Sequence, residues 1–209
     1  MKAHILDLID IEKVNTLLEG FNKLTGFVTA ILDLEGNVIS QSGWRTMCTD
    51  FHRRHPEASQ RCRISDTVLA GKMAGGETYH SYQCLNGLVD VAVPLVVQGE
   101  HLANLFSGQF FLETPDEAFF REQSHRYGFD EAAYLESMRN IPIVKEDQVR
   151  VAMDFLLNMT GLISVMAYQK LELKELNEKI AANEEKLHEL NADLESKVQQ
   201  RTAQLEEIN

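Results

Sequence analysis

Three cysteines carry the most versatile chemistry in this sequence: Cys48, Cys62 and Cys84. A cysteine thiolate can act as a nucleophile, a redox centre or a metal ligand when its pKa and its neighbours permit. The three lie far apart in the sequence, but each falls in an element that we expect to surround one pocket. His52 follows Cys48 by one helical turn and shares its helix face, and His55 is the next candidate. Cys48, Cys62, Cys84 and His52 are therefore a candidate transition-metal site.

Other interpretations of the cysteines stay open. The sequence has no C-x-x-C pair, the spacing found in most structural zinc sites, and a buried free cysteine often serves only as a small apolar side chain. A catalytic cysteine needs a nearby base and an orienting partner. No such arrangement stands out, so we predict no catalytic residues and no enzymatic activity. An odd number of cysteines does not indicate a disulfide framework, and we expect reduced thiols and a cytoplasmic location.

Residues 82–111 contain a second concentration of chemistry. Two apolar runs, 88–97 and 101–106, flank the turn residues Gln98-Gly99-Glu100, which predicts a β-hairpin. Cys84 lies at one end of it, and Ser107-Gly108-Gln109 lies among aromatic residues at the other. Such a mixture at one end of an apolar sheet is typical of a pocket wall, where Gln109 would orient a ligand by a hydrogen bond. The candidate ligand-binding residues are Trp44, Cys48, Cys62, Cys84, Leu88, Phe106, Gln109 and Phe110.

Asp90 is an unusual residue because it interrupts the first apolar run. A carboxylate in such a run must either face solvent or be satisfied by a partner. Since an antiparallel sheet commonly has one solvated face, we expect Asp90 to point into solvent. Asp116 and Glu117 are expected to be helix-start charges, so neither provides a catalytic carboxylate.

The pattern of elements predicts an α+β fold with an antiparallel sheet of about five strands flanked by helices. Helices are expected at 7–25, 118–127 and 130–139, and Thr114 is the expected N-cap of the second of these. Two further helices are expected within 46–72, where they meet at His55-Pro56. Strands are expected at 27–32, 38–40, 78–83, 88–97 and 101–110.

A long helix is predicted from Lys145 to the end of the sequence. Its first part should pack on the domain, and its last part has a heptad seam in which Asn183 takes a core position. The spacing shifts by one residue after Leu194, a stutter that locally unwinds a coiled coil. The seam suits either a dimerisation stalk or a signalling helix whose register matters. Its apolar residues are Leu173, Leu176, Ile180, Leu187, Leu190 and Leu194, followed out of register by Val198, Leu205 and Ile208.

Composition excludes several classes of partner. The chain has 209 residues and a formal net charge of −12, so nucleic acid and anionic membranes are poor partners. No run reaches the roughly 20 apolar residues of a membrane span, and the N-terminus lacks the features of a signal peptide. A hydrophobic fraction of 44% permits a real core. We therefore expect one domain over 1–168 and a coiled-coil helix over 169–209, which leads to an output domain outside this chain.

The ordered motifs resemble the PocR-type sensory domain. They are Gly43-Trp44, Cys48, Cys62, Tyr82-Gln-Cys84-x-x-Gly87-Leu88, Val93-Pro94-Leu95-x-x-x-Gly99 and Leu105-x-x-Gly108-Gln109-Phe110. The resemblance implies a PAS-like fold that senses simple hydrocarbon derivatives such as alcohols or diols. It also implies a role for Cys48, Cys62 and Cys84 in ligand or metal binding, whereas His52 and His55 do not come from it.

The resemblance further implies a signal-transduction protein such as a two-component histidine kinase, a cyclic-dinucleotide enzyme or a transcription regulator. The terminal segment 194–209 is similar to connectors that precede kinase, PAS or diguanylate cyclase domains. We therefore predict a cytosolic sensor that acts as a dimer, with a metal or redox sensor as the alternative. No cofactor is predicted beyond a possible transition metal at the cysteine cluster.

Overall fold

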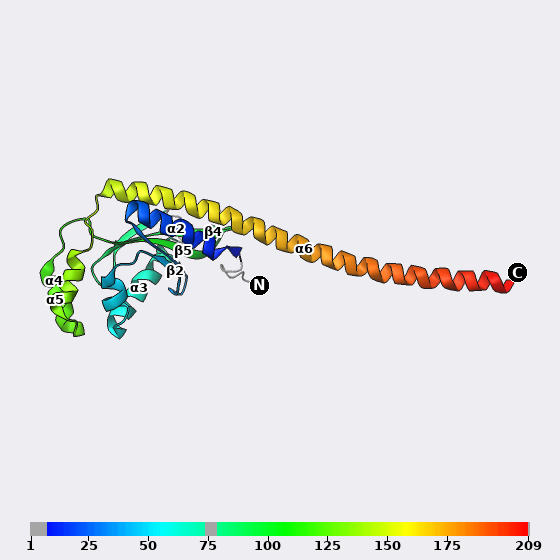
Figure 1. The fold of residues 1–209 in the computed structure, drawn as a ribbon, viewed down its shortest axis with the longest axis horizontal. Helices are drawn as coiled ribbons and strands as arrows, with labels where there is room; N and C mark the ends of the chain where they lie inside the picture. Colours follow the sequence, from blue (N-terminus) through cyan, green and yellow to red (C-terminus); the bar gives the residue numbers. More distant parts are fainter. Residues whose placement is uncertain (1–7, 74–78, 209) are drawn as a thin grey trace. The chain divides into compact units, whose positions relative to one another are not determined.

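The computed structural model describes residues 8–73 and 79–208, with side chains placed at 8–67 and 79–204. The described residues form a five-stranded antiparallel sheet in the order β2-β1-β5-β4-β3. Helices cover both of its faces (Figure 1). The predicted α+β, PAS-like fold class is confirmed.

The strands are β1 (Val28–Asp33), β2 (Val38–Ser42), β3 (His80–Gln83), β4 (Val89–Val97) and β5 (Glu100–Phe110). The helices are α2 (Ile11–Thr25), the π-helix η1 (Met47–His52), α3 (Pro56–Met73), α4 (Glu117–Tyr127), α5 (Glu131–Arg139) and α6 (Glu146–Ile208). The predicted starts at residues 7 and 78 lie outside the described residues.

The predicted hairpin is the centre of the sheet. Val97 pairs with Glu100, so Gln98 and Gly99 alone make the turn, with φ of 53° and 79°. Two consecutive positive φ values define a type I′ turn, whose twist matches that of the strands it joins. The second hairpin strand, β5, pairs with both β4 and β1 and is therefore the central strand.

The two faces of the sheet have different coverings. Figure 1 shows α2 and the first part of α6 on one face and α3 on the opposite face. Ala30, Ala92 and Phe106 form one line across β1, β5 and β4, and they pack against half-buried Trp44 and Tyr82. Because side chains alternate along a strand, this line defines the face on which the residues of the candidate site gather.

Two local details differ from the expectations. The first of the two helices expected within 46–72 is a single π-helical turn, whereas the second begins at Pro56 as predicted. The N-cap of α4 is Asp116, whose carboxylate accepts the Ala118 N–H at 2.9 Å, so the predicted Thr114 cap is wrong. An aspartate closer to the helix start provides the stronger acceptor for an unpaired N–H group.

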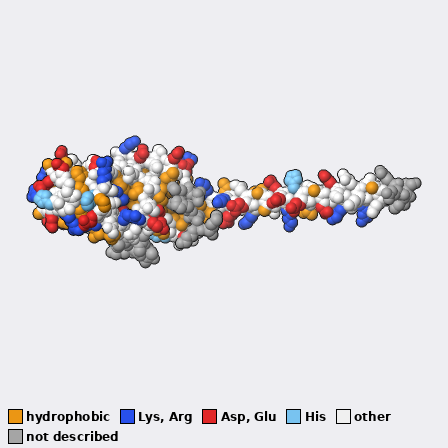
Figure 2. Space-filling model, turned by 90° about the horizontal axis from the view of Figure 1, so that it is seen from below, with side chains coloured by type: hydrophobic (Ala, Val, Ile, Leu, Met, Phe, Trp, Pro, Cys, Tyr) orange, Lys and Arg blue, Asp and Glu red, His pale blue; other side chains and the backbone are white. Residues whose placement is uncertain are grey.

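The long C-terminal helix is confirmed as α6, of 63 residues. The chain divides into compact units at Ala167 and Tyr168, and residues 168–209 form the second unit. Hydrophobic side chains recur among charged ones along its exposed surface (Figure 2). The exposed apolar side chains of this unit include Leu173, Leu176, Ile180, Leu187, Leu190, Leu194 and Val198. The side chains of Leu205 and Ile208 lie outside the described part.

Within the described residues, one helix is long and apolar enough by composition to span a membrane, over Glu146–Gln204. Its most apolar window has a mean hydropathy of 1.5, and 39% of that window is buried. The core helix of a soluble protein meets the same criterion, so this finding is weak evidence for a membrane span.

Candidate functional site

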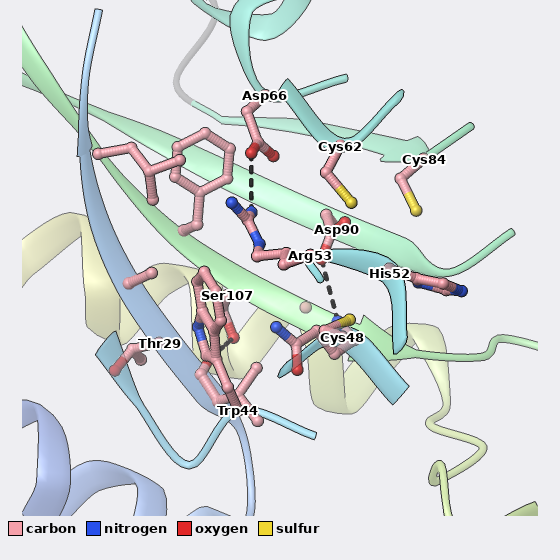
Figure 3. Close-up of a pocket in the computed structure, with 16 residues that line it drawn as sticks. Thr29, Trp44, Cys48, His52, Arg53, Cys62, Asp66, Cys84, Asp90 and Ser107 are labelled. Carbon is pink, nitrogen blue, oxygen red and sulfur yellow. Dashed lines mark hydrogen bonds and ion pairs between the residues drawn. The ribbon is translucent and has the colours of Figure 1, made fainter. Parts of the chain in front are cut away.

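A cavity of about 40 Å³ lies between the sheet and the segment that carries Trp44 and η1 (Figure 3). Such a volume holds a few water molecules or an organic molecule of a few heavy atoms. The sheet supplies one wall, η1 and α3 supply the other, and Cys84 closes one end. The lining residues are Val28, Thr29, Ala30, Leu32, Trp44, Cys48, His52, Arg53, Cys62, Asp66, Cys84, Asp90, Phe106, Ser107, Gly108 and Gln109.

Asp90 brings a carboxyl group into the cavity from β4. Its Oδ1 atom accepts the backbone N–H of Gln109 at 3.0 Å. Burial, reinforced by the nearby Asp66 charge, raises the pKa of Asp90 to about 7. The expected solvent-facing orientation is wrong, because the opposite face of this strand packs under helices and the cavity provides the partners.

Arg53 and Asp66 form a partly buried ion pair on the opposite wall, with Nη2 and Oδ2 separated by 2.9 Å. The Arg53 guanidinium also lies 4.4 Å from the centroid of the Trp44 ring, a cation–π contact. Burial opposes the Arg53 cation, but the Asp66 carboxylate raises the pKa of Arg53 overall. Burial raises the pKa of Asp66, and Arg53 opposes that rise. Figure 3 shows the Asp66 carboxylate directed at the Arg53 guanidinium.

All three cysteines line this cavity, as predicted, and all three are free and buried. Burial raises the pKa of Cys48 and Cys84 well above the usual range and that of Cys62 to about 11. Cys62 Sγ accepts a hydrogen bond from Asn86 Nδ2 at 3.2 Å. The thiols are therefore protonated at neutral pH, the form that is poorly nucleophilic and poorly ligating.

His52 lines the cavity but is engaged in the core. The amide of Gln123 donates through Nε2 to the backbone carbonyl of Asn86, which leaves its Oε1 atom to accept the hydroxyl hydrogen of Tyr134. The Tyr134 oxygen can therefore accept a hydrogen bond, and His52 Nε2 donates it at 2.7 Å. This chain fixes the tautomer with the proton on Nε2. Burial lowers the pKa of His52 to about 3, so the ring is neutral. Its Nδ1 atom is buried and has no hydrogen-bond partner.

The residues described contain no group of three or more His, Cys, Asp or Glu side chains arranged to hold a metal ion. The proposed ligand His52 has its Nε2 atom committed to Tyr134. His55 Nδ1 instead accepts the Ala58 N–H at the start of α3. The geometry therefore gives the metal-binding alternative no support.

Six of the eight predicted ligand-binding residues line the cavity: Trp44, Cys48, Cys62, Cys84, Phe106 and Gln109. Leu88 lies instead in the core cluster with Phe111 and Phe120, and Phe110 packs edge-on against Phe27. Neither lines the cavity.

Sequence reasoning missed Arg53, Asp66 and Asp90 as cavity residues. A carboxylate inside an apolar strand was the available signal for Asp90, since such a group needs either solvent or a built partner. Arg53 and Asp66 are polar residues in helical segments, a pattern that surface helices share. Only the pairing of η1 with α3 brings them together.

Two comparisons with named proteins give distant similarities. The Regulatory protein PocR of Salmonella typhimurium (strain LT2) is 27% identical over 146 residues, which cover 69% of this chain and 48% of that protein. The chain thus spans about half the length of that curated relative. The crystal structure of a GAF domain/HD domain protein from Geobacter sulfurreducens aligns with a TM-score of 0.43 and 13% identity, covering 79% of this chain and 98% of that one. That TM-score is too low to establish a shared fold.

The family comparison covers most of the chain. The model of the sensory domain found in PocR matches residues 7–168, a range that contains the whole sheet and every residue of the cavity. The chain therefore belongs to the family of PocR sensory domains.

Proposed function

We propose that this domain senses a small, neutral, hydroxyl-bearing molecule, such as a simple alcohol or diol, in the cavity beneath Trp44. The observation that carries the proposal is a cavity that combines an ion pair and a carboxyl group with apolar walls. Ligand sites are typically apolar with a few convergent polar groups that fix orientation. Membership of the PocR sensory family agrees with this role.

The charges of the cavity favour a neutral ligand. Arg53 is already neutralised by Asp66, and Asp90 adds either no charge or a second negative charge, according to its protonation. A carboxylate or phosphate ligand would face uncompensated like charge in a buried site, which is costly. A hydroxyl group can donate to Asp90 and accept from Arg53, so it can satisfy groups of both kinds.

The size of the cavity favours a small ligand. About 40 Å³ has no room for a nucleotide, a flavin or a haem without large movement of the walls. Ala30, Phe106 and Trp44 provide apolar contact for a short hydrocarbon skeleton. This combination suits a molecule with one end apolar and one or two hydroxyl groups.

We further propose that α6 carries the response to an output domain and that residues 169–209 pair with a second copy as a coiled coil. The seam side chains of residues 168–204 are about half exposed in the single chain, for example Leu187 at 59% and Leu190 at 50%. Exposed leucines at a/d spacing are stabilised by pairing. In this proposal the sensor is a cytoplasmic homodimer with no nucleic-acid or membrane partner and no catalytic role of its own.

A binding experiment tests the cavity. Native mass spectrometry would look for a co-purifying small molecule, and calorimetry would measure binding of two- to four-carbon alcohols and diols. Ala30→Leu places a larger side chain in the cavity wall and should abolish binding. Gln41→Leu is the matched control, because Gln41 pairs with Ala30 on the neighbouring strand but is exposed and outside the cavity. Binding that persists in Ala30→Leu would place the ligand elsewhere.

A further inference from the structure

Gln109 has an unusual backbone for its position in the central strand. Its φ of 56° lies in the left-handed region, which non-glycine residues rarely adopt. Val89 pairs with Phe110 and Asp90 pairs with Gly108, so Gln109 is the extra residue of a β-bulge. A strained backbone of this kind persists only when its surroundings hold it, and it is enriched at functional and switching sites.

Two hydrogen bonds hold Gln109 in this conformation. Its backbone N–H donates to Asp90 Oδ1 at 3.0 Å, and its side-chain Oε1 accepts the backbone N–H of Arg45 at 2.6 Å. Gln109 is 6% exposed, and both bonds are partly buried. One residue thus bonds a carboxyl group inside the cavity and the chain segment that closes the cavity.

The peptide held by Gln109 is well placed to move the cavity wall. Trp44 directly precedes Arg45, and the carbonyl of Arg45 accepts the N–H groups of Cys48 and Thr49, which begin η1. Trp44 and Cys48 both line the cavity. A short π-helical turn has few hydrogen bonds of its own, so its position depends on what anchors its start.

We propose that Gln109 is a positioning residue that couples Asp90 to the part of the cavity wall formed by Trp44. When a ligand hydrogen-bonds to Asp90 in place of the Gln109 N–H, Gln109 is held less firmly and the Trp44–Arg45 segment moves. The proposal rests on the proposed function, because it supposes that the cavity is the ligand site. It adds a role to the one predicted for Gln109, because the side-chain oxygen accepts the backbone N–H of Arg45.

Trp44 is the only tryptophan of the sequence, so its fluorescence reports on this wall alone. Acrylamide quenching measures its accessibility in the full chain without any ligand. Gln109→Gly removes the acceptor for Arg45 and tolerates the positive φ, so it should raise the quenching constant about twofold or more without loss of the folded state. Gln109→Asn, which also tolerates this backbone but is too short to reach Arg45, should do the same.

Gln98→Gly is the matched control. Gln98 also has a positive φ, 53°, but it lies in the β4–β5 turn and does not line the cavity. The control relieves the same kind of backbone strain and should leave Trp44 quenching unchanged. Unchanged quenching in both Gln109 variants would overturn the proposal, whatever ligand the protein binds.

A second pair of variants tests the link to Asp90. Asp90→Ala removes the acceptor of the Gln109 N–H and should raise quenching as Gln109→Gly does, whereas Asp90→Asn keeps an oxygen acceptor and should not. Equal quenching in Asp90→Ala and the wild type would overturn the coupling.

Ethane-1,2-diol then separates this inference from the proposed function. The diol should change the quenching of the wild type and of Gln98→Gly but not that of Gln109→Gly. One outcome is that the diol leaves the quenching of the wild type unchanged while the variants measured without ligand behave as expected. In that case the proposed ligand class fails and the coupling stands. If Gln109→Gly responds to the diol like the wild type, the coupling fails and the ligand site stands.

Discussion

Asp90 and Gly108 are register partners in β4 and β5, and the Asp90 carboxyl group occupies the space that a side chain at position 108 would need. A Cβ atom at Gly108 would lie 2.7 Å from Asp90 Cα and closer still to its Oδ1 atom. Gly108 has no positive φ, so it is the close approach of Asp90 that requires glycine. The carboxyl is thereby folded back onto the sheet, where the N–H of Gln109 meets it.

Gly108→Ala should destabilise the domain by about 1–3 kcal/mol, since overpacking against backbone forces strands to shift. It should also abolish ligand binding if Asp90 contacts the ligand. Urea denaturation measures the first effect and calorimetry the second. Gly161→Ala is the control, because a Cβ atom there meets nothing within 4 Å and the position is in α6. That change should stabilise by about 0.5–1 kcal/mol. Equal stability of the two alanine variants would contradict the packing argument.

The pH dependence of stability should reveal Asp90 and His52 as opposing groups. The pKa of Asp90 is raised by burial from 3.8 to about 7, so the folded state keeps a proton that the unfolded state releases. Its contribution to stability therefore falls as pH rises from about 4 to 7. The pKa of His52 is lowered by burial from 6.5 to about 3, so its contribution is present above pH 6.5 and is lost as pH falls. The two slopes oppose each other between about pH 4 and 6.5.

Asp90→Asn should remove the opposing effect of Asp90, so that the effect of His52 dominates. The free energy of unfolding should then rise with pH by up to about 1.4 kcal/mol per pH unit between about pH 4 and 6.5. The titratable groups that face Asp90 are Asp66, Arg53, Tyr82 and the three cysteines. Burial also raises the pKa of Asp66, so Asp66, like Asp90, lowers the stability as pH rises. Urea midpoints measured at half-unit pH steps would test this. A variant that keeps the slope of the wild type would show that Asp90 titrates normally.

Tyr134→Phe should cost about 1–3 kcal/mol of stability, because it leaves both His52 Nε2 and Gln123 Oε1 buried without a partner. Tyr134 is fully buried. Tyr168→Phe removes the same hydroxyl from an exposed position, where its partner is Glu172, and should change stability by less than about 0.5 kcal/mol. Thermal unfolding of the two variants provides the comparison. A neutral Tyr134→Phe would indicate that water replaces the hydroxyl.

The three thiols should be inert in the folded protein. Burial raises the pKa of Cys62 to about 11, so its thiolate fraction at pH 8 is about a hundredfold lower than at a pKa of 9. Cys48 and Cys84 are shifted in the same direction by the same cause. Reaction with a chromogenic disulfide at pH 8 should therefore be slow in the native state and release three equivalents only after unfolding. A thiol that reacts rapidly in native buffer would favour the redox-sensor alternative.

The fold was more predictable than the site, and the reason is physical. The hairpin of 88–97 and 101–110 follows from β-branched runs around Gln98-Gly99, signals that are local in sequence. Cys84 and Gln109 were recognised because polar groups stood among aromatic ones. The Arg53–Asp66 pair depends on how η1 and α3 meet, which no local pattern encodes. The Asp90 carboxyl points into the cavity because Gly108 leaves room for it. The two residues are partners only in the register of β4 with β5, which the sequence does not show.

Leu187→Glu should convert a dimer into a monomer, because it places a charge in the proposed heptad seam. Leu187 is 59% exposed in the single chain, so the substitution costs the isolated helix little, and its effect should appear only in association. Ala192→Glu adds the same side chain on the outer face of the same helix and is the matched control. Sedimentation equilibrium of the full chain should give a dimer for the wild type and Ala192→Glu and a monomer for Leu187→Glu. Since a ligand signal that acts on coil register needs two helices, a wild-type monomer at every concentration would exclude that route to an output domain.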